Sequence, residues 1–427
     1  MVLQKTNNIS YFSKTQSRRE EGDFKRNGHY VPIRISLSSK DHIRRIELDN
    51  MEKKRPRDNS VQDNQRRKNL HTVMLYCLEH GGCSKREICV GTGLSWGLIS
   101  RIANDLTKRG FLEVTAHDRL PGSGRNASGF VASENRYVSF GISIEKGRFI
   151  LSVMSLKGNT LYRIERMMDT TSKEKVIASL YLIVEEGLSF TKKNAKELLS
   201  IGLSVSSYVH SDQGVIVHFP GLSKEEWDDV DVCSLLREKY DVPSFVERDG
   251  ACLLFEEFVK EGAADKALLL LDNSLSFGLM RDSRMVLPSS FWDLGHTMYG
   301  PFEGKGMLTL SNIASVKGLS SRLGVSEEEL FSHPETYKEE LAEVGRYLGL
   351  SLQNVHRLVR LKNIVFAGRL FELKDYFLEE LYSSLGTLLG VDAKKEFGFS
   401  FAKSNDGSNG AALLSMHEGL KEALGKR

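Results

Sequence analysis

Residues 84–110, "SKREICVGTGLSWGLISRIANDLTKRG", carry a close series of helix start and stop signals. Ser84 followed three residues later by Glu87 is a capping box, which predicts the start of a short helix. The glycines of "GTGL" (91–94) predict a tight turn, and Ser95 suits the N-cap of a second helix. The stretch therefore predicts two helices joined by a short turn.

The second of these helices has one apolar face. Ile99, Ile102 and Leu106 recur at helical spacing, and Gly110 is a typical residue to end the helix. We expect these three side chains to point into a core and the remaining face to meet solvent or a partner.

The flanking segments complete a recognisable order of elements. Upstream, "NLHTVMLYCLEHGG" (69–82) has apolar residues at helical spacing before Gly81-Gly82 stops the pattern. Downstream, residues 111–133 predict two strands around a tip rich in glycine, serine and proline. Helix, short helix, turn, helix and hairpin together predict a winged helix-turn-helix domain over residues 61–133.

The polar face of the last helix suits DNA. A recognition helix meets base edges with its N-terminal turn, and Arg101 and Asn104 have the planar groups that pair with guanine and adenine or hold phosphate. Because Gly97 has no side chain, the backbone of this helix can come close to DNA. The candidate DNA-binding residues are Lys85, Arg86, Ser95, Trp96, Gly97, Ser100, Arg101, Asn104 and Arg125. The alternatives are a domain that binds protein or a helix face that only meets solvent.

The charge distribution favours the same partner. The net charge is +3, but the first 133 residues carry 24 lysines and arginines against 14 aspartates and glutamates, so the rest of the chain is acidic. A basic N-terminal part on an otherwise acidic chain indicates contact with a polyanion. The alternative is a basic N-terminal segment that only increases solubility. Residues 1–60 are polar and charged without periodicity and predict a disordered extension; Met51 is an alternative start of the protein.

The composition of the chain argues against several other classes of protein. With 427 residues and 40% hydrophobic residues, the chain has room for two or three domains with ordinary cores. No apolar run is long enough to span a membrane and no secretory signal is visible, so we expect a cytoplasmic protein. The five cysteines include no CxxC pair, and the sequence predicts buried free thiols rather than a zinc or redox site.

The remainder, residues 134–427, predicts an α/β fold. Residues 136–167 alternate apolar and polar residues with turn signals at Lys146-Gly147 and Lys157-Gly158, which is typical of a β-meander. A helix over 173–187 and a buried strand follow. A second pass of the same order, with strands from Lys266, a helix over 336–359, a strand and a C-terminal helix, predicts two α/β lobes that face a cleft.

The sequence resembles the ROK family of sugar-responsive repressors and sugar kinases from about residue 62 to 425. The resemblance is carried by the helix-turn-helix stretch, "VPSFVERDGACLLFEEF" (242–258), "WDLGHTMYGPFEGKGM" (292–307) and "GAALL" (410–414). It implies two actin-like, sugar-kinase-like (ribonuclease H-like) α/β lobes behind the winged helix-turn-helix. It also implies assembly as a homodimer or higher oligomer.

The phosphate sites that the family uses are altered here. In the first one, Ser143 and Glu145 stand where the resemblance places an aspartate and a glycine. In the second, Asp272, Ser274 and Ser276 replace glycines. Because glycine-rich turns let backbone amides reach phosphates and carboxylates repel them, we expect no ATP, no cofactor and no kinase activity.

The sugar site is altered less. Asp249 stands at the position of the family's general base, but Arg248 replaces the partner asparagine and has the charge to pair with Asp249. Asp293 and His296 remain in the following motif. These residues, Asp249, Asp293 and His296, are candidate sugar ligands; the alternative is a purely structural role.

The zinc motif of the family is replaced. An ungapped overlay of its cysteines on residues 300–307 gives Gly300, Phe302 and Met307, so we expect no metal and expect Phe302 and Met307 to fill the space with apolar packing.

The sequence thus predicts a repressor of carbohydrate-utilisation genes that binds a double-stranded DNA operator as a homodimer. The lobes are expected to serve dimerisation and the sensing of a sugar or sugar phosphate. Two alternatives stay open: a ROK-type carbohydrate kinase with an appended DNA-binding domain, and a DNA-binding protein with no small ligand.

Overall fold

A computed structural model of the chain describes residues 59–116, 128–261, 265–282, 284–286, 293–302, 304 and 306–425. The predicted disordered extension and the alternative start at Met51 lie outside these residues, as do the tip of the predicted hairpin and Arg125. In the part of the chain that the structure describes, no helix is long and apolar enough to cross a membrane.

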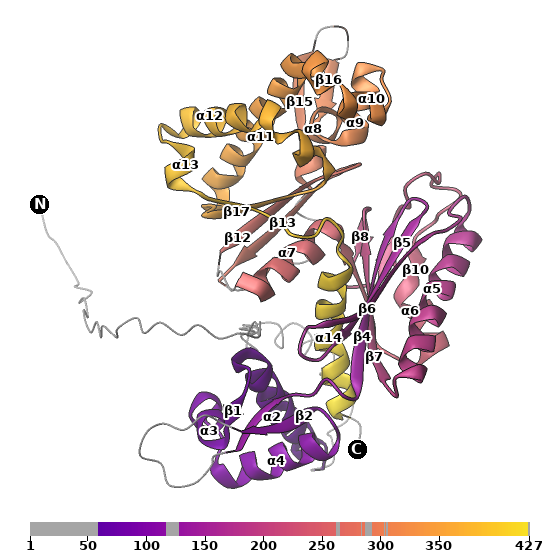
Figure 1. The fold of residues 1–427 in the computed structure, drawn as a ribbon, viewed down its shortest axis with the longest axis vertical. Helices are drawn as coiled ribbons and strands as arrows, with labels where there is room; N and C mark the ends of the chain where they lie inside the picture. The colour runs from indigo at the N-terminus through magenta and orange to yellow at the C-terminus, as the bar shows by residue number, and fades with distance from the viewer. Residues whose placement is uncertain are drawn as a thin grey trace, which may run out of the picture. The chain divides into compact units, whose positions relative to one another are not determined.

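The N-terminal segment, defined here as residues 59–132, holds three helices and a small antiparallel sheet of order β1-β3-β2 (Figure 1). Its elements are α2 (Asn59–His80), β1 (Cys83–Ser84), α3 (Lys85–Thr92), α4 (Trp96–Lys108), β2 (Leu112–Ala116) and β3 (Ser128–Ala132). The predicted capping box is confirmed, because the Ser84 hydroxyl accepts from the Glu87 amide and the Glu87 carboxylate accepts from the Ser84 amide. The sequence analysis did not predict β1.

The predicted apolar face of α4 is confirmed. Ile99, Ile102 and Leu106 are buried in a core shared with α2 and the small sheet. Ser95 occupies the N-cap position, but its side chain makes no capping hydrogen bond. Gly110 follows the helix with a φ of 80°, a conformation that favours glycine.

A five-stranded sheet follows, with strand order β11-β7-β4-β5-β6. The meander β4-β5-β6 is antiparallel, whereas β7 and β11 run parallel to β4. The bounds are β4 (Tyr137–Glu145), β5 (Arg148–Ser155), β6 (Thr160–Met167), α5 (Lys173–Lys193), β7 (Glu197–Val205), β8 (Val209–His210), β9 (Val215–Ile216), β10 (Val230–Asp231), α6 (Val232–Tyr240) and β11 (Ser244–Arg248). The predicted meander and its two turns are confirmed.

A second five-stranded sheet repeats this topology, with order β14-β13-β12-β17-β18. In each sheet the first strand of a meander pairs in parallel with the fourth strand, which pairs in parallel with the fifth. The strands are β12 (Lys266–Leu271), β13 (Leu275–Arg281), β14 (Arg284–Met285), β17 (Asn363–Ala367) and β18 (Gly398–Phe401). The predicted α/β fold with a second pass of strands is confirmed, and we call the elements around each of the two sheets a lobe.

The elements around the second sheet are mostly helical, and a short hairpin, β15-β16, lies among them. They are α7 (Asp249–Glu261), η2 (Leu294–His296), β15 (Met298–Phe302), β16 (Gly306–Thr309), α8 (Leu310–Ala314), α9 (Val316–Leu323), α10 (Glu327–Ser332), η3 (Pro334–Tyr337), α11 (Lys338–Val359), η4 (Arg369–Tyr376), α12 (Leu378–Leu389) and α13 (Ala393–Glu396). The last helix is α14 (Ser408–Gly425).

Two predicted helix bounds were wrong. The helix predicted to end at residue 187 continues to Lys193, because Leu188 and Phe190 extend its apolar face. The helix predicted from residue 336 begins at Lys338 after a separate 3-10 turn that opens on Pro334, whose fixed φ suits a first helical position.

The last helix, α14, packs on the first sheet and not on the second. A Cβ added at Gly202 of β7 would lie 2.0 Å from the Ala411 carbonyl oxygen, so helix and strand meet through their backbones. The C-terminal half of α14 contacts the N-terminal segment, where the Arg109 guanidinium donates to the Ala423 carbonyl over 2.5 Å. α14 thus joins the first lobe to α2.

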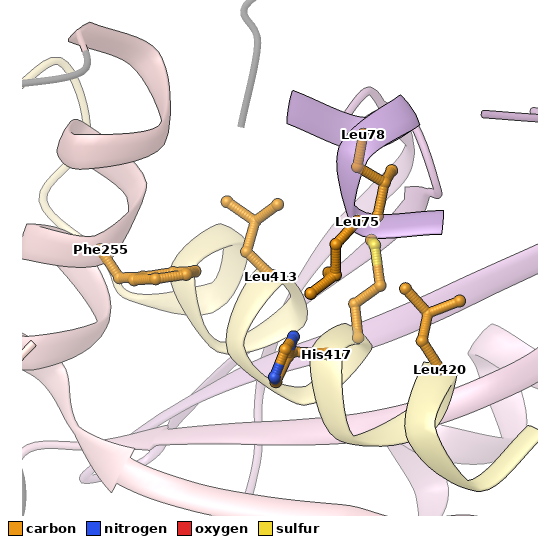
Figure 2. Close-up of a pocket in the computed structure, with 7 residues that line it drawn as sticks. Leu75, Leu78, Phe255, Leu413, His417 and Leu420 are labelled. Atoms are coloured by element: carbon orange, nitrogen blue, oxygen red, sulfur yellow. The ribbon is translucent and has the colours of Figure 1, made fainter. Parts of the chain in front are cut away.

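Two histidines meet where α2 and α14 pack. The rings of His71 and His417 lie edge to face with centroids 5.0 Å apart. Figure 2 shows His417 among apolar side chains of three helices, Leu75, Leu78, Phe255, Leu413 and Leu420. Neither His417 nitrogen has a hydrogen-bond partner among the described residues. Burial lowers the pKa of His71 to about 4 and the pKa of His417 to about 3, with nearby Lys421 acting in the same direction and Glu418 opposing it at His71.

This pair predicts an acid-labile contact. A histidine of ordinary pKa near 6.5 takes up a proton in the unfolded chain before the buried rings do, so the folded state loses stability as pH falls from about 6.5 toward 4. We expect the thermal midpoint to fall more between pH 7.5 and pH 5 in the wild type than in the double variant His71→Leu, His417→Leu.

The matched control is His210→Leu, which alters an exposed histidine. The same pH dependence in the double variant and in the control would contradict the assignment.

Candidate functional site

The first turn of α4 presents an open surface. Trp96 is 58% exposed, which is high for so large an apolar side chain. A Cβ added at Gly97 would meet nothing within 4 Å. Arg101 and Asn104 lie exposed on the same helix, and the Arg101 Nε donates only a long bond of 3.4 Å to the Gly97 carbonyl. These side chains are available to a partner.

The other predicted residues of this surface lie on α3 and at the α4 cap. Arg86 and Ser95 are exposed, whereas Ser100 and Lys85 are partly buried. The Lys85 ammonium lies 5.9 Å from the Phe130 ring of the small sheet. The sequence analysis did not consider Val90, which is 80% exposed near the end of α3.

A pocket lies between the ends of β4, β12 and α14. It is lined by most of the residues that stand where the ROK resemblance places phosphate-binding residues. Its lining comprises Ser143, Glu145, Lys146, Ser206, Pro220, Asp249, Leu270, Asp272, Asn273, Asn405, Asp406 and Gly407. Burial raises the pKa of Glu145, and the neighbouring Asp272 and Asp249 add to the rise despite the bond from Arg148. The pocket is therefore a region of negative potential, which disfavours a polyphosphate.

The Asp272 carboxylate occupies backbone donors of this pocket. One oxygen accepts from the Asn273 amide over 2.9 Å and the other from the Arg369 amide over 3.1 Å. Backbone amides of this kind cradle phosphates in nucleotide-binding turns. In this protein the Asp272 carboxylate accepts from these amides, in the place that a phosphate would take.

The candidate sugar ligands fall into two neighbouring groups. Asp249 lines the pocket, and its Oδ1 accepts from the Gly250 amide over 2.7 Å. Burial raises the pKa of Asp249, although the charge of Arg248 opposes the rise. Asp293 and His296 lie beside each other, with His296 Nδ1 2.7 Å from Asp293 Oδ2.

Arg248 links these groups. Its guanidinium Nη1 lies 3.8 Å from Asp293 Oδ1, so within the described residues Arg248 forms its ion pair with Asp293 and not with Asp249, the partner that the sequence suggests. Arg248 is 7% exposed, and within the described residues its Nε and Nη1 and the facing Asp293 Oδ1 have no hydrogen-bond partner. A buried guanidinium and a partly buried carboxylate thus face each other across a distance too long for a hydrogen bond.

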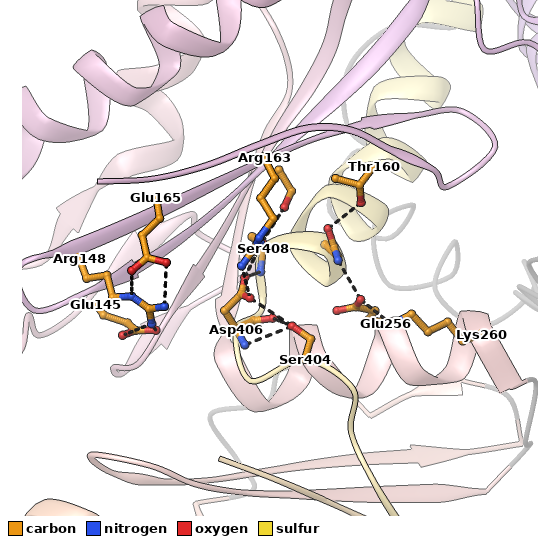
Figure 3. Close-up of polar contacts among 12 residues, drawn as sticks. Glu145, Arg148, Thr160, Arg163, Glu165, Glu256, Lys260, Ser404, Asp406 and Ser408 are labelled. Atoms are coloured by element: carbon orange, nitrogen blue, oxygen red, sulfur yellow. Dashed lines mark hydrogen bonds and ion pairs between the residues drawn. The ribbon is translucent and has the colours of Figure 1, made fainter. Parts of the chain in front are cut away.

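A further polar cluster, which the sequence analysis missed, ties the pocket to α14 (Figure 3). The Arg163 guanidinium of β6 lies 2.8 Å from Asp406 Oδ2, and Asp406 accepts from the Ser408 hydroxyl and amide at the start of α14. Although burial alone would raise it, these bonds hold the pKa of Asp406 below its usual range. The sequence "SNDG" (404–407) before the last helix was the available signal.

The β15-β16 hairpin contains the positions of the replaced zinc motif. Phe302 packs on Tyr347, with ring centroids 5.4 Å apart, as predicted. The prediction for Met307 was wrong, since it is 48% exposed on the outer face of the hairpin strand. Gly300 has a φ of 125°. No group of three or more metal-ligating side chains is found in the described parts of the chain.

The two sheets of repeated topology and the altered pocket between strand ends define a sugar-kinase-like α/β protein whose phosphate positions hold its own carboxylates. Residues 139–418 match the ROK family, and the chain belongs to that family.

Similar proteins include both regulators and kinases. The chain is 20% identical to the DNA-binding transcriptional dual regulator NagC of Escherichia coli K12, over 75% of this chain and 85% of that protein. It is 20% identical to the xylose repressor of Bacillus subtilis, over 81% of this chain and 93% of that protein.

Solved structures share the fold. A ROK family transcriptional regulator, a homologue of the E. coli MLC protein, superposes with a TM-score of 0.71 at 16% identity, over 84% of this chain and 98% of that one. The ROK hexokinase of Thermus thermophilus gives a TM-score of 0.55 at 20% identity, over 66% and 98%.

The pocket predicts that nucleotide does not bind. We expect no saturable heat when MgATP is titrated into the full chain at millimolar concentration, because Glu145, Asp249 and Asp272 repel the phosphates. The double variant Glu145→Gln, Asp272→Asn removes two of these charges and should bind MgATP better than the wild type does. Saturable binding by the wild type would contradict the prediction.

Proposed function

We propose that this chain is a sequence-specific DNA-binding transcriptional repressor of carbohydrate-utilisation genes and not an enzyme. The observation that carries the proposal is the open first turn of α4, with Trp96, Gly97, Arg101 and Asn104 free of the core. Regulators and repressors among the similar proteins support the same function.

The N-terminal segment is proposed to be a winged helix-turn-helix domain spanning residues 61–133. α4 then enters the major groove with its first turn toward the base edges, because this is where a recognition helix presents its side chains. Arg101 and Asn104 are assigned to bases, and Lys85 and Arg86 at the start of α3 to the phosphate backbone. Ser95 and Ser100 supply hydroxyls that suit phosphate or base contacts.

Two copies of the chain are proposed to bind one operator. Two-fold symmetric proteins read palindromic half-sites about one helical turn apart, which doubles the number of contacts that a single α4 makes. The lobes, which hold most of the core, are assigned to dimerisation.

The pocket is proposed to serve sensing in place of phosphoryl transfer. Phosphoryl transfer depends on groups that hold and neutralise the phosphates. Here Asp272 occupies two backbone donors and Glu145 and Asp249 add negative charge. A coupled assay of ADP release with a panel of sugars tests this, and sugar-dependent turnover would show that the chain is a carbohydrate kinase instead.

The effector is proposed to be a neutral sugar. The Arg248 and Asp293 atoms that lack a hydrogen-bond partner within the described residues suit hydroxyl groups, which accept from a guanidinium and donate to a carboxylate. The carboxylates of Asp249, Asp293 and nearby Glu145 disfavour a sugar phosphate. His296, which is largely exposed beside Asp293, is assigned to another hydroxyl.

This proposal predicts selective binding. In calorimetry, one of xylose, glucose or N-acetylglucosamine should bind the full chain, and its phosphate should bind at least tenfold more weakly. Arg248→Ala and Asp293→Asn should abolish the binding, whereas Arg166→Ala, which alters an exposed arginine paired with Glu186, should preserve it. Tighter binding of the phosphate would contradict the charge argument. No binding by any sugar would favour a regulator without a small ligand.

The DNA interface predicts a different pair of effects. Arg101→Ala should weaken binding to a selected operator by about 1–3 kcal/mol, roughly 5- to 150-fold, and relax base preference at one position of each half-site. Lys108→Ala removes the same charge from the other end of α4 and should change affinity little. Fluorescence anisotropy with operator and mutated duplexes measures both, and equal effects of the two variants would contradict the role of Arg101.

A second variant separates DNA contact from folding. Gly97→Ala places a methyl group where the protein has open space, and alanine favours a helix by about 1 kcal/mol over glycine. We therefore expect a higher thermal midpoint together with weaker DNA binding. Unchanged affinity would show that nothing approaches Gly97 closely.

A further inference from the structure

Trp96 is the first residue of α4, and its large apolar side chain lies mostly outside the core. The indole is 58% exposed, although the same helix buries Ile99, Ile102 and Leu106. Trp227 shows the usual placement of this residue type, because it is fully buried and its Nε1 donates to the Ile216 carbonyl over 2.9 Å. Since burial of an indole would stabilise the fold, its exposure at the start of α4 indicates contact with a partner.

The surroundings of Trp96 leave the first turn of α4 open. A Cβ added at Gly93, just before the helix, or at Gly97 would meet no described atom within 4 Å. Ser95 is exposed, and its side chain makes no capping hydrogen bond. Among the described residues, the approach to the indole is thus clear of backbone and side chains at both neighbouring glycines.

The charges near this turn suit duplex DNA as the partner. The first turn of α4 contains no acidic residue, and Arg101 lies exposed in the next turn. Lys85 and Arg86 add two cations at the start of α3. Cations attract the phosphates, while an apolar ring among them requires an apolar group on the base edges.

We propose that Trp96 recognises thymine, with its indole packed on the C5-methyl group of one thymine in each half-site. This methyl group is the apolar feature that base pairs present in the major groove. The indole has no charge and a single N–H donor, so it suits a methyl group better than a phosphate oxygen. The inference depends on the proposed function, because it requires α4 to lie in the major groove.

This assignment gives Trp96 a role different from those of the other residues on α4. Arg101 and Asn104 lie about one and about two turns further along the helix and act through hydrogen bonds. The preference for thymine at the Trp96 position should therefore depend on the methyl group and not on hydrogen bonding. Deoxyuridine isolates this contribution, because it lacks only the methyl group and keeps every hydrogen-bonding group of thymine.

The test uses the full chain and an operator selected with it. Each symmetric pair of thymines in the half-sites is replaced in turn by deoxyuridine, and fluorescence anisotropy measures the affinity. We expect one pair of positions at which affinity falls about fourfold for each methyl group lost, or roughly 15-fold for the pair, as expected for burial of one methyl-sized group. Other thymines should tolerate the replacement.

Variants then connect the methyl group to Trp96. Trp96→Ala should bind thymine and deoxyuridine equally well at that position, whereas Trp96→Phe keeps an aromatic ring and should retain a difference of about twofold or more for the pair. The matched control is Val114→Ala, which truncates another exposed apolar side chain, on β2, and should retain the full difference. Circular dichroism and the thermal midpoint should be unchanged in all three variants, because each alters an exposed side chain.

The outcomes separate this inference from the proposed function. Equal binding of thymine and deoxyuridine by the wild type at every position would overturn the inference and leave DNA recognition in place. The same holds if the full difference persists in Trp96→Ala, or if the selected half-sites contain no thymine. Failure to select any common sequence would contradict the proposed function, and the role of Trp96 with it.

Discussion

The packing of α14 on the first sheet is the constraint on which the rest of the structure depends. Gly202 leaves no space between strand and helix, so the helix position is fixed by backbone contact and not by adjustable side chains. One end of α14 begins at the Asp406–Arg163 pair beside the pocket, and its other end contacts α2 through His417 and the bond from Arg109. A single helix therefore touches both the pocket that we propose to sense a sugar and the segment that we propose to bind DNA.

This arrangement gives a physical basis for the proposed regulation. A ligand shifts an equilibrium only by the difference in its affinity for two states. Arg248 and Asp293 come from different lobes and face each other at 3.8 Å, so a sugar that bridges them favours one placement of the lobes. Asp406 lines the pocket that Asp249, the neighbour of Arg248 in the chain, also lines, and it holds the start of α14, so that placement is expected to reach α2 through the helix.

The sequence predicted the elements whose signals are local. Three local signals were sufficient to predict elements of the fold, because each depends on residues close in the chain. They are the capping box at Ser84, the apolar face of α4 and the repeated order of strands and helices. Contacts between distant residues were not predictable in this way. The Arg163–Asp406 pair, the His71–His417 contact and the choice of Asp293 as the partner of Arg248 arise from residues that only the fold brings together. Met307 was misplaced because apolar character does not show which face of a short hairpin is covered.

The central claim is that this chain reads DNA sequence and does not phosphorylate sugar. Selection of genomic DNA fragments with the full-length chain, followed by sequencing, tests it most directly. The account predicts enrichment of one palindromic sequence whose half-sites lie about one helical turn apart, and loss of that enrichment in the presence of a neutral sugar. Recovery of fragments without any common sequence would contradict it.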